Sequence, residues 1–413
     1  MIRSALQLPE RIPGGAAPFR APATQHFGSG AVERVADEAG RLGARRALVI
    51  TDPGVEQAGI AGRVRDLLEG AGVATALYAE VEPEPSVASI ERALQVLQEL
   101  QGAQGAQGAQ ETSRKGPPDL LVGVGGGSAL DSTKGVSLRL ANPGPLQQYF
   151  GVELVPQTGP PMILIPTTAG TGSEVTPNAI FDDTERRLKA GIVSHRLLAS
   201  AALVDPDLTL GLPPGVTAAS GLDALTHAME SYVAVKATPH TDLYALEATR
   251  LIGANLGTAV ARGGHREARY GQMLGSFFAG IAITNAGTGL CHAMAYPLGS
   301  AYHVPHGMAN ALLLPAVLEY NMSADLPKFA RLAGALGEPV EGRSLRQAAA
   351  GAAAAVRALS REVGLPAGLR EVGVPESALE GFVPGALSAA RLIDNNPRRP
   401  TPEDVLAVYR QSY

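Results

Sequence analysis

One carboxylate and three imidazoles in the second half of the chain are the residues best suited to chemistry. Asp223 and His227 occur in GLDALTHAMESY, His292 in GLCHAMAYPLG and His306 in HVPHGMAN. Together they form a mixed oxygen and nitrogen set that suits a single Fe²⁺ or Zn²⁺ ion. Upstream, the glycine-dense segment VGVGGGSALDSTKG allows a backbone to approach a phosphate closely. A metal site and a dinucleotide site in one chain predict a metal-assisted hydride transfer.

The first two candidate ligands are expected on one helix. Asp223 and His227 are four residues apart in an apolar stretch, so that on a helix they share one face, one turn apart. A buried Asp in such surroundings is costly unless it is paired or bound to a metal. The pair therefore fits either two metal ligands or a buried Asp–His hydrogen bond.

The last candidate ligand is open between two histidines. His292 is expected in a helix, and His306 follows Pro305 at the expected start of another helix. His303 is an alternative to His306. Because Pro297 and Pro305 are expected to break the helix between them, helical periodicity does not decide between His303 and His306.

The glycines at 123–127 follow an apolar run and precede a predicted helix, whose amino end favours a pyrophosphate. The segment is not a Walker motif, because no glycine precedes Lys134. It is also an imperfect G-x-G-x-x-G, because Ser128 fills the last position. The pattern fits a dinucleotide site or a tight strand-to-helix turn alone.

Two further segments have the composition of a cofactor site. Asp52 ends the run LVIT, where an acid can accept hydrogen bonds from a ribose and repel a 2′-phosphate, or can cap a helix. Residues 166–178, PTTAGTGSEVTPN, are rich in small hydroxyls and glycines, which suits either a cofactor-wrapping loop or an ordinary loop.

The first half of the chain alternates β-branched apolar runs with amphipathic stretches, which predicts a parallel, doubly wound sheet. Strands are expected at 47–51, 73–79, 119–125 and 162–168, and helices near 55–70, near 86–100 and from about Ser128. From Pro213 onward the pattern is helical. We therefore predict an α/β dinucleotide-binding domain over 1–207 and an all-helical metal-binding domain over 208–413. The GAQ repeats at 102–110 are expected to form a solvent loop.

Composition narrows the class of protein. The chain has 413 residues, a net charge of −5 and no basic run, which argues against nucleic acid and anionic membranes as partners. No apolar stretch reaches the length of a membrane span, and the first residues lack the apolar core of a signal peptide. Cys291 is the only cysteine, so no internal disulfide is possible. We expect a cytoplasmic enzyme.

Taken in order, the motifs resemble the iron-containing (group III) alcohol dehydrogenase family. The match runs nearly end to end, from FGSGAVERV through GGGSALDSTK, PTTAGTGSEVT and GLDALTHAMESY to HAMAYPLGSAYHVPHGMANALLLP. The resemblance implies an N-terminal cofactor domain, a C-terminal helical metal domain, an active site in the cleft between them and a homodimer or larger homo-oligomer. It also implies an alcohol or aldehyde as the small-molecule substrate.

The resemblance assigns individual residues. It implies that the metal ligands are Asp223, His227, His292 and His306, and so favours His306 over His303. For the cofactor, it places Gly126, Gly127 and Ser128 at the pyrophosphate, Asp131 and Asn178 near the nicotinamide, Lys189 near its ribose, and Thr167, Thr168 and Thr171 in contact with the cofactor. Asp52 falls where members that prefer NAD carry an acid, so NAD is expected rather than NADP. The metal is expected to be Fe²⁺, with Zn²⁺ as the alternative.

The chain departs from the family at one position. Many members carry a histidine four residues after the third ligand, where this chain has Tyr296. With a reference pKa near 10, a tyrosine is a poor proton relay at neutral pH. We therefore expect Tyr296 to shape the pocket, and Asp131 and Tyr296 are the candidates for a direct part in catalysis.

Other activities fit parts of the pattern. Within the oxidoreductases these are a maleylacetate reductase, which works without metal and is disfavoured by Asp223, and a hydroxyacid–oxoacid transhydrogenase. A glycerol dehydrogenase is a closer relative, but its pattern has three ligands. From another class, a dehydroquinate synthase-like lyase would need a Lys and Arg cluster to bind phosphate near the ligands, and none is present. A scaffold protein would not need complete ligand and cofactor motifs.

Overall fold

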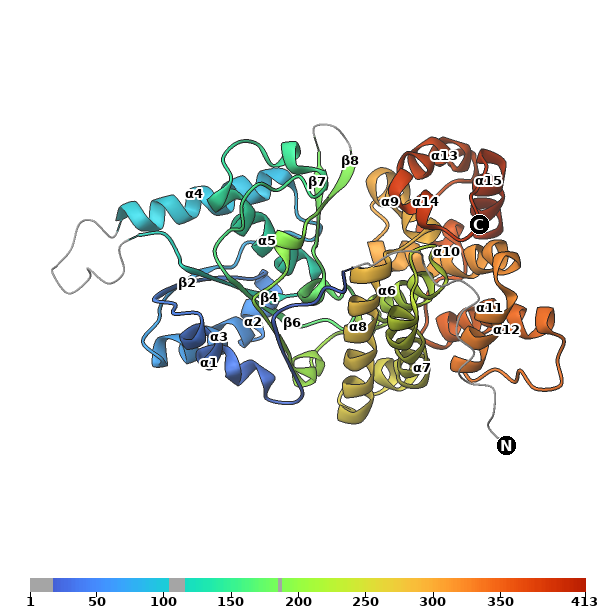
Figure 1. The fold of residues 1–413 in the computed structure, drawn as a ribbon, viewed down its shortest axis with the longest axis horizontal. Helices are drawn as coiled ribbons and strands as arrows, with labels where there is room; N and C mark the ends of the chain where they lie inside the picture. Colours follow the sequence, from blue (N-terminus) through green and yellow to red (C-terminus); the bar gives the residue numbers. More distant parts are fainter. Residues whose placement is uncertain (1–17, 104–115, 185–187) are drawn as a thin grey trace. The chain divides into compact units, whose positions relative to one another are not determined.

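The computed structural model describes residues 18–103, 116–184 and 188–413. The chain divides into two compact units, each made of more than one segment (Figure 1). Among the described residues, one unit contains 21–103, 116–184, 188–217 and 262–273, and the other contains 18–20, 218–261 and 274–413. The expected boundary at residue 207 between two domains stays a prediction.

A six-stranded sheet forms the centre of the first unit. Its strand order is β1-β9-β6-β4-β2-β3, and every pairing within it is parallel. Strands β2, β3, β4 and β6 confirm the four strands expected from the sequence. The bounds are β1 Thr24–Phe27, β2 Arg46–Ile50, β3 Ala74–Tyr78, β4 Leu120–Gly125, β6 Met162–Pro166 and β9 Ala201–Val204.

Helices cover both faces of this sheet, which confirms the doubly wound α/β fold. Along β4, Leu121 belongs to one hydrophobic cluster, whereas Val122 and Val124 belong to another. The first cluster includes Ile90 of α4, and the second includes Val64 of α3. The helices are α1 Val35–Arg41, α2 Pro53–Gln57, α3 Ile60–Gly70, α4 Val87–Ala103 and α5 Gly127–Ala141.

Three local features differ from the sequence expectation. The helix expected near 55–70 is two helices, because Gly59 between them has a left-handed φ of 77°. Strands β1 and β9 were not predicted. Neither was a second sheet of β5 Gly151–Val152, β7 Asn178–Asp183 and β8 Leu188–Val193, in which β7 and β8 are antiparallel. Of the GAQ repeats, α4 includes the residues up to Ala103, and the rest lie outside the described residues.

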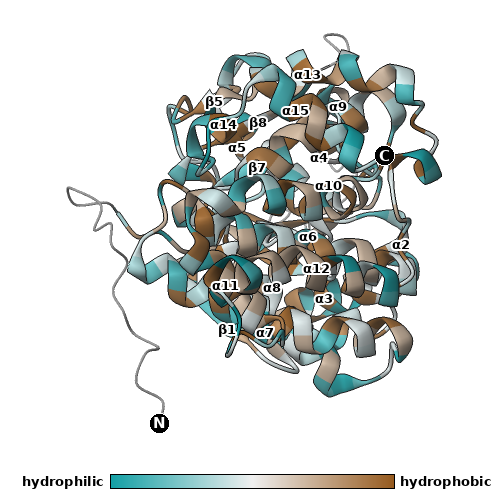
Figure 2. Cartoon of the chain, turned by 90° about the vertical axis from the view of Figure 1, so that its right-hand side faces the viewer, coloured by the Kyte–Doolittle hydropathy of each residue, from teal (hydrophilic) through white to brown (hydrophobic). Residues whose placement is uncertain are grey.

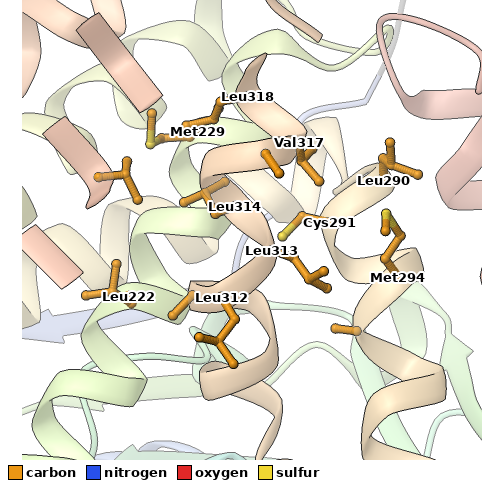
Figure 3. Packing of buried hydrophobic residues seen from close by; sticks show 14 of the residues in the cluster. Leu222, Met229, Leu290, Cys291, Met294, Leu312, Leu313, Leu314, Val317 and Leu318 are labelled. Atoms are coloured by element: carbon orange, nitrogen blue, oxygen red, sulfur yellow. The ribbon is translucent and has the colours of Figure 1, made fainter. Parts of the chain in front are cut away.

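From Pro214 onward the described chain is helical, as the sequence predicts. The longer helices are α6 Pro214–Val233, α7 Pro239–Ala261, α8 Arg266–Ala286, α9 Leu290–Tyr302, α10 His306–Asn321, α11 Leu326–Ala335 and α12 Leu345–Glu362. The chain then forms α13 Leu379–Ser388, α14 Ala390–Asn395 and α15 Pro402–Gln411. Side chains of α6, α9 and α10 pack into one large core, in which Leu222, Met294 and Leu313 are buried (Figure 3).

The prediction that Pro297 breaks the helix after His292 is wrong. Pro297 lies inside α9, which continues to Tyr302. A proline within a helix removes one backbone hydrogen bond and crowds the preceding turn. Its ring lies against Gly385 of α13, where an added Cβ would be 3.0 Å from the Pro297 Cγ. The helix thus continues through the proline, and the proline ring packs on this glycine.

Among the described residues, no single helix is long and apolar enough to cross a membrane. Helices α8 and α9 pass the same length and composition test only as a pair, and they are bent by 104° at their break. Other helices, such as α11, carry hydrophilic and hydrophobic residues together (Figure 2).

Candidate metal centre and dinucleotide site

Three helices of the helical unit bring the four predicted metal ligands together. Asp223 and His227 lie one turn apart on α6, His292 lies in the first turn of α9, and His306 is the first residue of α10. Asp223, His227 and His292 are buried, whereas the His306 side chain is 30% exposed. The cluster is therefore enclosed by protein at Asp223, His227 and His292 and accessible to solvent at His306.

The donor atoms are close enough to share one ion. One ligand atom from each of Asp223, His227 and His292 lies within 4.8 Å of the others. The Asp223 Oδ1 lies 4.0 Å from the His292 Nε2 and 3.9 Å from the His306 Nε2. His303 ends α9 with a left-handed φ of 52° and is exposed. The structure thus brings His306, and not His303, to this cluster.

The Asn310 side chain indicates that these donors fit a divalent cation. Its Nδ2 lies 2.7 Å from the Asp223 Oδ1, 3.3 Å from the His292 Nε2 and 3.2 Å from the His306 Nε2. An amide NH₂ has two hydrogens, yet three acceptors converge on it. The Asn310 Oδ1 is buried and, within the part of the chain that the structure describes, has no hydrogen-bond partner. A small cation satisfies such converging lone pairs better than the amide does.

Electrostatics keep the carboxylate of the cluster charged. Burial by itself raises the pKa of Asp223, but the charges of His227, His306 and His292 and the Asn310 hydrogen bond outweigh it, so that its pKa is lowered. Those charges exist only on protonated imidazoles, and a metal binds the unprotonated nitrogens, so in the metal-bound cluster the cation would replace the imidazole charges beside the carboxylate.

Cys291 lies beside His292 but is not a candidate ligand. Its thiol is buried among apolar side chains that include Leu290, Met294 and Leu313 (Figure 3), and its Sγ contacts the Asn310 carbonyl oxygen at 3.4 Å. Burial, together with nearby carboxylates, raises the pKa of the Cys291 thiol well above its usual value. Because the thiolate is the form that binds metal, this cysteine serves packing.

Sequence reasoning missed one buried acid at the cluster. Glu230 lies on α6 seven residues after Asp223, and its carboxylate contacts the Cys291 N–H and the His292 Nδ1, each at 2.6 Å. The spacing His-x-x-Glu puts Glu230 on the same helix face as His227, and this was the available signal. Asn396 was missed as well; its Oδ1 accepts the N–H of Leu290 at 3.2 Å.

Tyr296 lies next to the cluster, on the side of His306. The two rings are stacked, with centroids 6.2 Å apart and an interplanar angle of 23°. Burial raises the pKa of Tyr296, and nearby carboxylates add to the effect. The phenol therefore keeps its proton at neutral pH, which supports the expectation that it shapes the pocket.

The glycine turn of the sheet unit packs against the loop after β6. Gly126 caps α5, whose first residue is Gly127. A Cβ on Gly127 would lie 2.7 Å from the Thr171 Cγ2, and one on Gly126 would lie 3.3 Å from the Thr168 Cγ2. The Thr167 N–H donates to the Gly125 carbonyl oxygen at 2.9 Å. The structure thus brings the predicted pyrophosphate turn and the three predicted threonines side by side.

Asp52 caps the short helix α2. Its Oδ1 accepts the N–H groups of Gly54 and Val55 at 2.9 and 3.0 Å. A Cβ on Gly125 would be 3.1 Å from the other oxygen, Oδ2. The helix cap that the sequence allowed is present, and the second carboxylate oxygen lies beside the glycine turn.

Asp131 belongs to a buried polar network at α5. Its oxygens accept the Ser173 hydroxyl at 2.6 Å and the Ile180 N–H at 2.9 Å. Lys134, one turn later, is fully buried and donates to the Ser173 Oγ at 2.7 Å and to the Asn178 carbonyl oxygen at 2.6 Å. Burial raises the pKa of Asp131, against the opposing charge of Lys134. This network fixes the predicted cofactor loop to α5.

Ser128 and Lys189 meet at Glu84. The Ser128 Oγ accepts the Glu84 N–H at 3.1 Å, and the Lys189 Nζ lies 2.9 Å from the Glu84 Oε1. Glu84 has a left-handed φ of 55°, which is uncommon for a residue with a side chain. The predicted pyrophosphate residue and the predicted ribose residue thus share one neighbour that the sequence did not indicate.

Models of one protein family match both halves of the chain. Residues 22–206 match the model of the iron-containing alcohol dehydrogenases, and residues 217–413 match the C-terminal model of the same family. Together these matches cover most of the chain. The chain therefore belongs to the iron-containing alcohol dehydrogenase family, and it is an oxidoreductase acting on alcohols.

Individual relatives are similar over nearly the whole chain. The 1,3-propanediol dehydrogenase of Klebsiella pneumoniae is 38% identical over 96% of this chain and 98% of its own length. A crystal structure of a 1,3-propanediol oxidoreductase has a TM-score of 0.90 at 38% identity, covering 96% of this chain and 99% of that one. The sulfoacetaldehyde reductase of Bifidobacterium kashiwanohense, in complex with NAD⁺, has a TM-score of 0.82 at 28% identity, with coverages of 96% and 99%.

Proposed function

We propose that this chain interconverts an alcohol with an aldehyde or ketone by hydride transfer to or from NAD(H), with one divalent cation held by Asp223, His227, His292 and His306. The observation that carries the proposal is the convergence of the Asp223, His292 and His306 donors on the Asn310 amide nitrogen. Fe²⁺ is the proposed ion, in keeping with the family, and Zn²⁺ accepts the same donors.

The cation would polarise the substrate oxygen, and the nicotinamide would carry the hydride. The protein supplies the negative charge of Asp223 and the three imidazoles, all from rigid helices. The partial exposure of His306 leaves the open side of the cluster beside it. At that side, the Tyr296 ring supplies an apolar wall, and its proton stays on the phenol oxygen.

The proposed cofactor site consists of the glycine turn, the three threonines and the residues around them. Gly126 and Gly127 present the amino end of α5, where backbone N–H groups and the helix dipole favour a pyrophosphate. Ser128, Asp131, Asn178 and Lys189 complete the proposed set. The Asp52 Oδ2 supports NAD rather than NADP, because a carboxylate repels a 2′-phosphate.

The substrate class is an alcohol and its aldehyde or ketone. The relatives named above act on compounds as different as a diol and a sulfonated aldehyde, so likeness to them does not choose one substrate. A panel of short alcohols, diols, aldehydes and charged aldehydes, assayed with NAD(H) and NADP(H), identifies it. A cytoplasmic location and a homodimeric or larger assembly remain predictions from the sequence and the family resemblance.

The proposal is tested by removing one ligand. We expect His227→Ala to lower bound iron or zinc and NAD(H)-dependent activity to background, because it removes a buried donor from the cluster. His303→Ala is the matched control, since it removes an exposed histidine three residues before His306 and should change neither quantity. Circular dichroism of both variants checks the fold. A His227→Ala protein that is metal-free and fully active would overturn the mechanism.

A further inference from the structure

Glu230 connects α6 to the first turn of α9. It is buried, with 4% of its surface exposed, and it uses both carboxylate oxygens. The Oε1 accepts the Cys291 N–H and the Oε2 contacts the His292 Nδ1, each at 2.6 Å. Gly289 caps the amino end of α9 but has no side chain that could accept the first N–H groups of the helix. The Glu230 carboxylate accepts one of them instead, at the helix end where the dipole stabilises a negative charge.

We propose that Glu230 is a positioning residue that holds His292 in the tautomer whose Nε2 binds the catalytic cation. This inference rests on the proposed function. An ionised carboxylate only accepts hydrogen bonds, so the Nδ1 that contacts it carries the proton. The Nε2 is then left with a free lone pair, which is the requirement for a metal ligand.

The orientation of the His292 ring agrees with this role. Its Nε2 is the atom that lies 4.0 Å from the Asp223 Oδ1 and 3.3 Å from the Asn310 Nδ2, on the side of the ligand cluster. The ring is also stacked on His227, with centroids 4.7 Å apart. Glu230 therefore fixes the proton at one edge of the ring, while the opposite edge faces the cation.

The substitution Glu230→Gln separates tautomer control from helix capping. The Cys291 N–H is a backbone donor, so the glutamine carbonyl oxygen turns toward it and preserves the cap. The glutamine NH₂ group then faces the His292 Nδ1, which must accept, and the proton of the ring moves to Nε2. The variant should therefore keep the fold but point an N–H at the cation site.

The test measures metal binding by apo-protein rather than turnover. We expect Glu230→Gln to weaken Zn²⁺ affinity about 10- to 100-fold in a chelator competition, the usual range for losing an outer partner of a metal-bound histidine. Glu38→Gln is the matched control, because Glu38 is also buried and contacts a histidine, His26, at 2.9 Å in the other unit. It should leave the Zn²⁺ affinity unchanged.

A second measurement is made on the wild-type protein and does not depend on the folding of Glu230→Gln. In ¹⁵N-histidine spectra of the wild-type apo-protein, with His292 assigned by substitution, the shifts should show a protonated Nδ1 and an unprotonated Nε2. A wild-type His292 with its proton on Nε2, or a folded Glu230→Gln protein with wild-type Zn²⁺ affinity, overturns the inference. Failure of the wild-type protein to bind metal would instead overturn the proposed function.

Discussion

At the scale of single residues, Asp52 combines a structural role with a proposed functional one. Its Oδ1 accepts two backbone N–H groups at the start of α2, and its Oδ2 faces the glycine turn. The cap requires an acceptor but no charge, because Asn caps a helix about as well as Asp. Rejection of a 2′-phosphate requires the charge. The two roles can therefore be separated by substitution.

We expect Asp52→Asn to keep stability and to change cofactor preference. With the carboxylate charge removed, the ratio of kcat/KM for NADPH to that for NADH should rise roughly tenfold, equivalent to about 1.4 kcal/mol. Steady-state kinetics with both cofactors and one alcohol measure the ratio. An unchanged ratio would mean that Asp52 serves only as the helix cap.

Asp52→Ala provides the comparison, because it removes the cap as well as the charge. We expect a similar change of cofactor preference, together with a loss of about 1 kcal/mol in the free energy of unfolding. Since the chain has no tryptophan, unfolding is followed by circular dichroism. A loss of stability in the Asn variant as large as in the Ala variant would contradict the capping argument.

At the scale of elements, α5 and the loop before β7 are joined by buried charges. Lys134 donates to atoms of Ser173, Thr176 and Asn178, and Asp131 accepts from Ser173 and Ile180. Glu174 is buried in the same loop. Burial raises its pKa from 4.5 to about 7, although the charge of Lys134 opposes the shift. The loop should therefore respond to pH.

The sign of the response follows from where the proton is bound. Between pH 4.5 and about 7 the folded protein keeps the Glu174 proton, whereas the unfolded chain releases it. The Glu174 contribution to stability is therefore full below pH 4.5 and is lost as pH rises to about 7, by roughly 3 kcal/mol. The free energy of unfolding, measured with urea, should depend less on pH between pH 5 and pH 8 in Glu174→Gln than in the wild type. Parallel curves for the variant and the wild type would count against this.

The sequence predicted those elements whose residues are continuous apolar runs. Strands β2, β4 and β6 contain such buried runs because helices cover both faces of the parallel sheet, whereas the predicted strand β3, ATALY, is an edge strand and mostly half-buried. The edge strand β1, TQHF, is only partly buried and has no such pattern. Strand β9 has four buried residues, too few for a period to be visible. The helix containing Pro297 continues past the proline, whose ring packs on Gly385 of a distant segment, a contact that local sequence does not show.

The residues of the candidate site also fall into two groups: those that spacing along the sequence predicts and those that only tertiary packing brings to the site. Asp223 and His227 were predictable from spacing along one helix. The choice of His306 over His303 came from family resemblance, because it depends on where α9 ends and α10 begins. Glu230 and Asn310 were not predicted as part of the cluster. Their partners lie up to 87 residues away in the chain, and such contacts follow from tertiary packing alone.

At the scale of the whole molecule, each compact unit contains one of the two proposed sites. The predicted metal ligands belong to the helical unit, and the predicted cofactor residues belong to the sheet unit. The chain crosses between the units more than once, since 262–273 belong to the sheet unit and their neighbours on both sides do not. The metal and the cofactor should therefore each slow amide hydrogen exchange first in the unit that binds them.

We expect metal and cofactor to give different patterns of amide protection. Zn²⁺ at about 100 times its Kd should add about 2.7 kcal/mol to the stability of the metal-binding state, because it binds the folded cluster and not the unfolded chain. When Zn²⁺ is added to protein from which a chelator has removed metal, hydrogen exchange should slow in α6, α9 and the start of α10. NADH alone should slow exchange in the β4–α5 turn and in residues 166–178. With His227→Ala, the Zn²⁺ effect should disappear and the NADH effect should remain. Protection of both segments by Zn²⁺ alone in that variant would place the metal elsewhere than at the four predicted ligands.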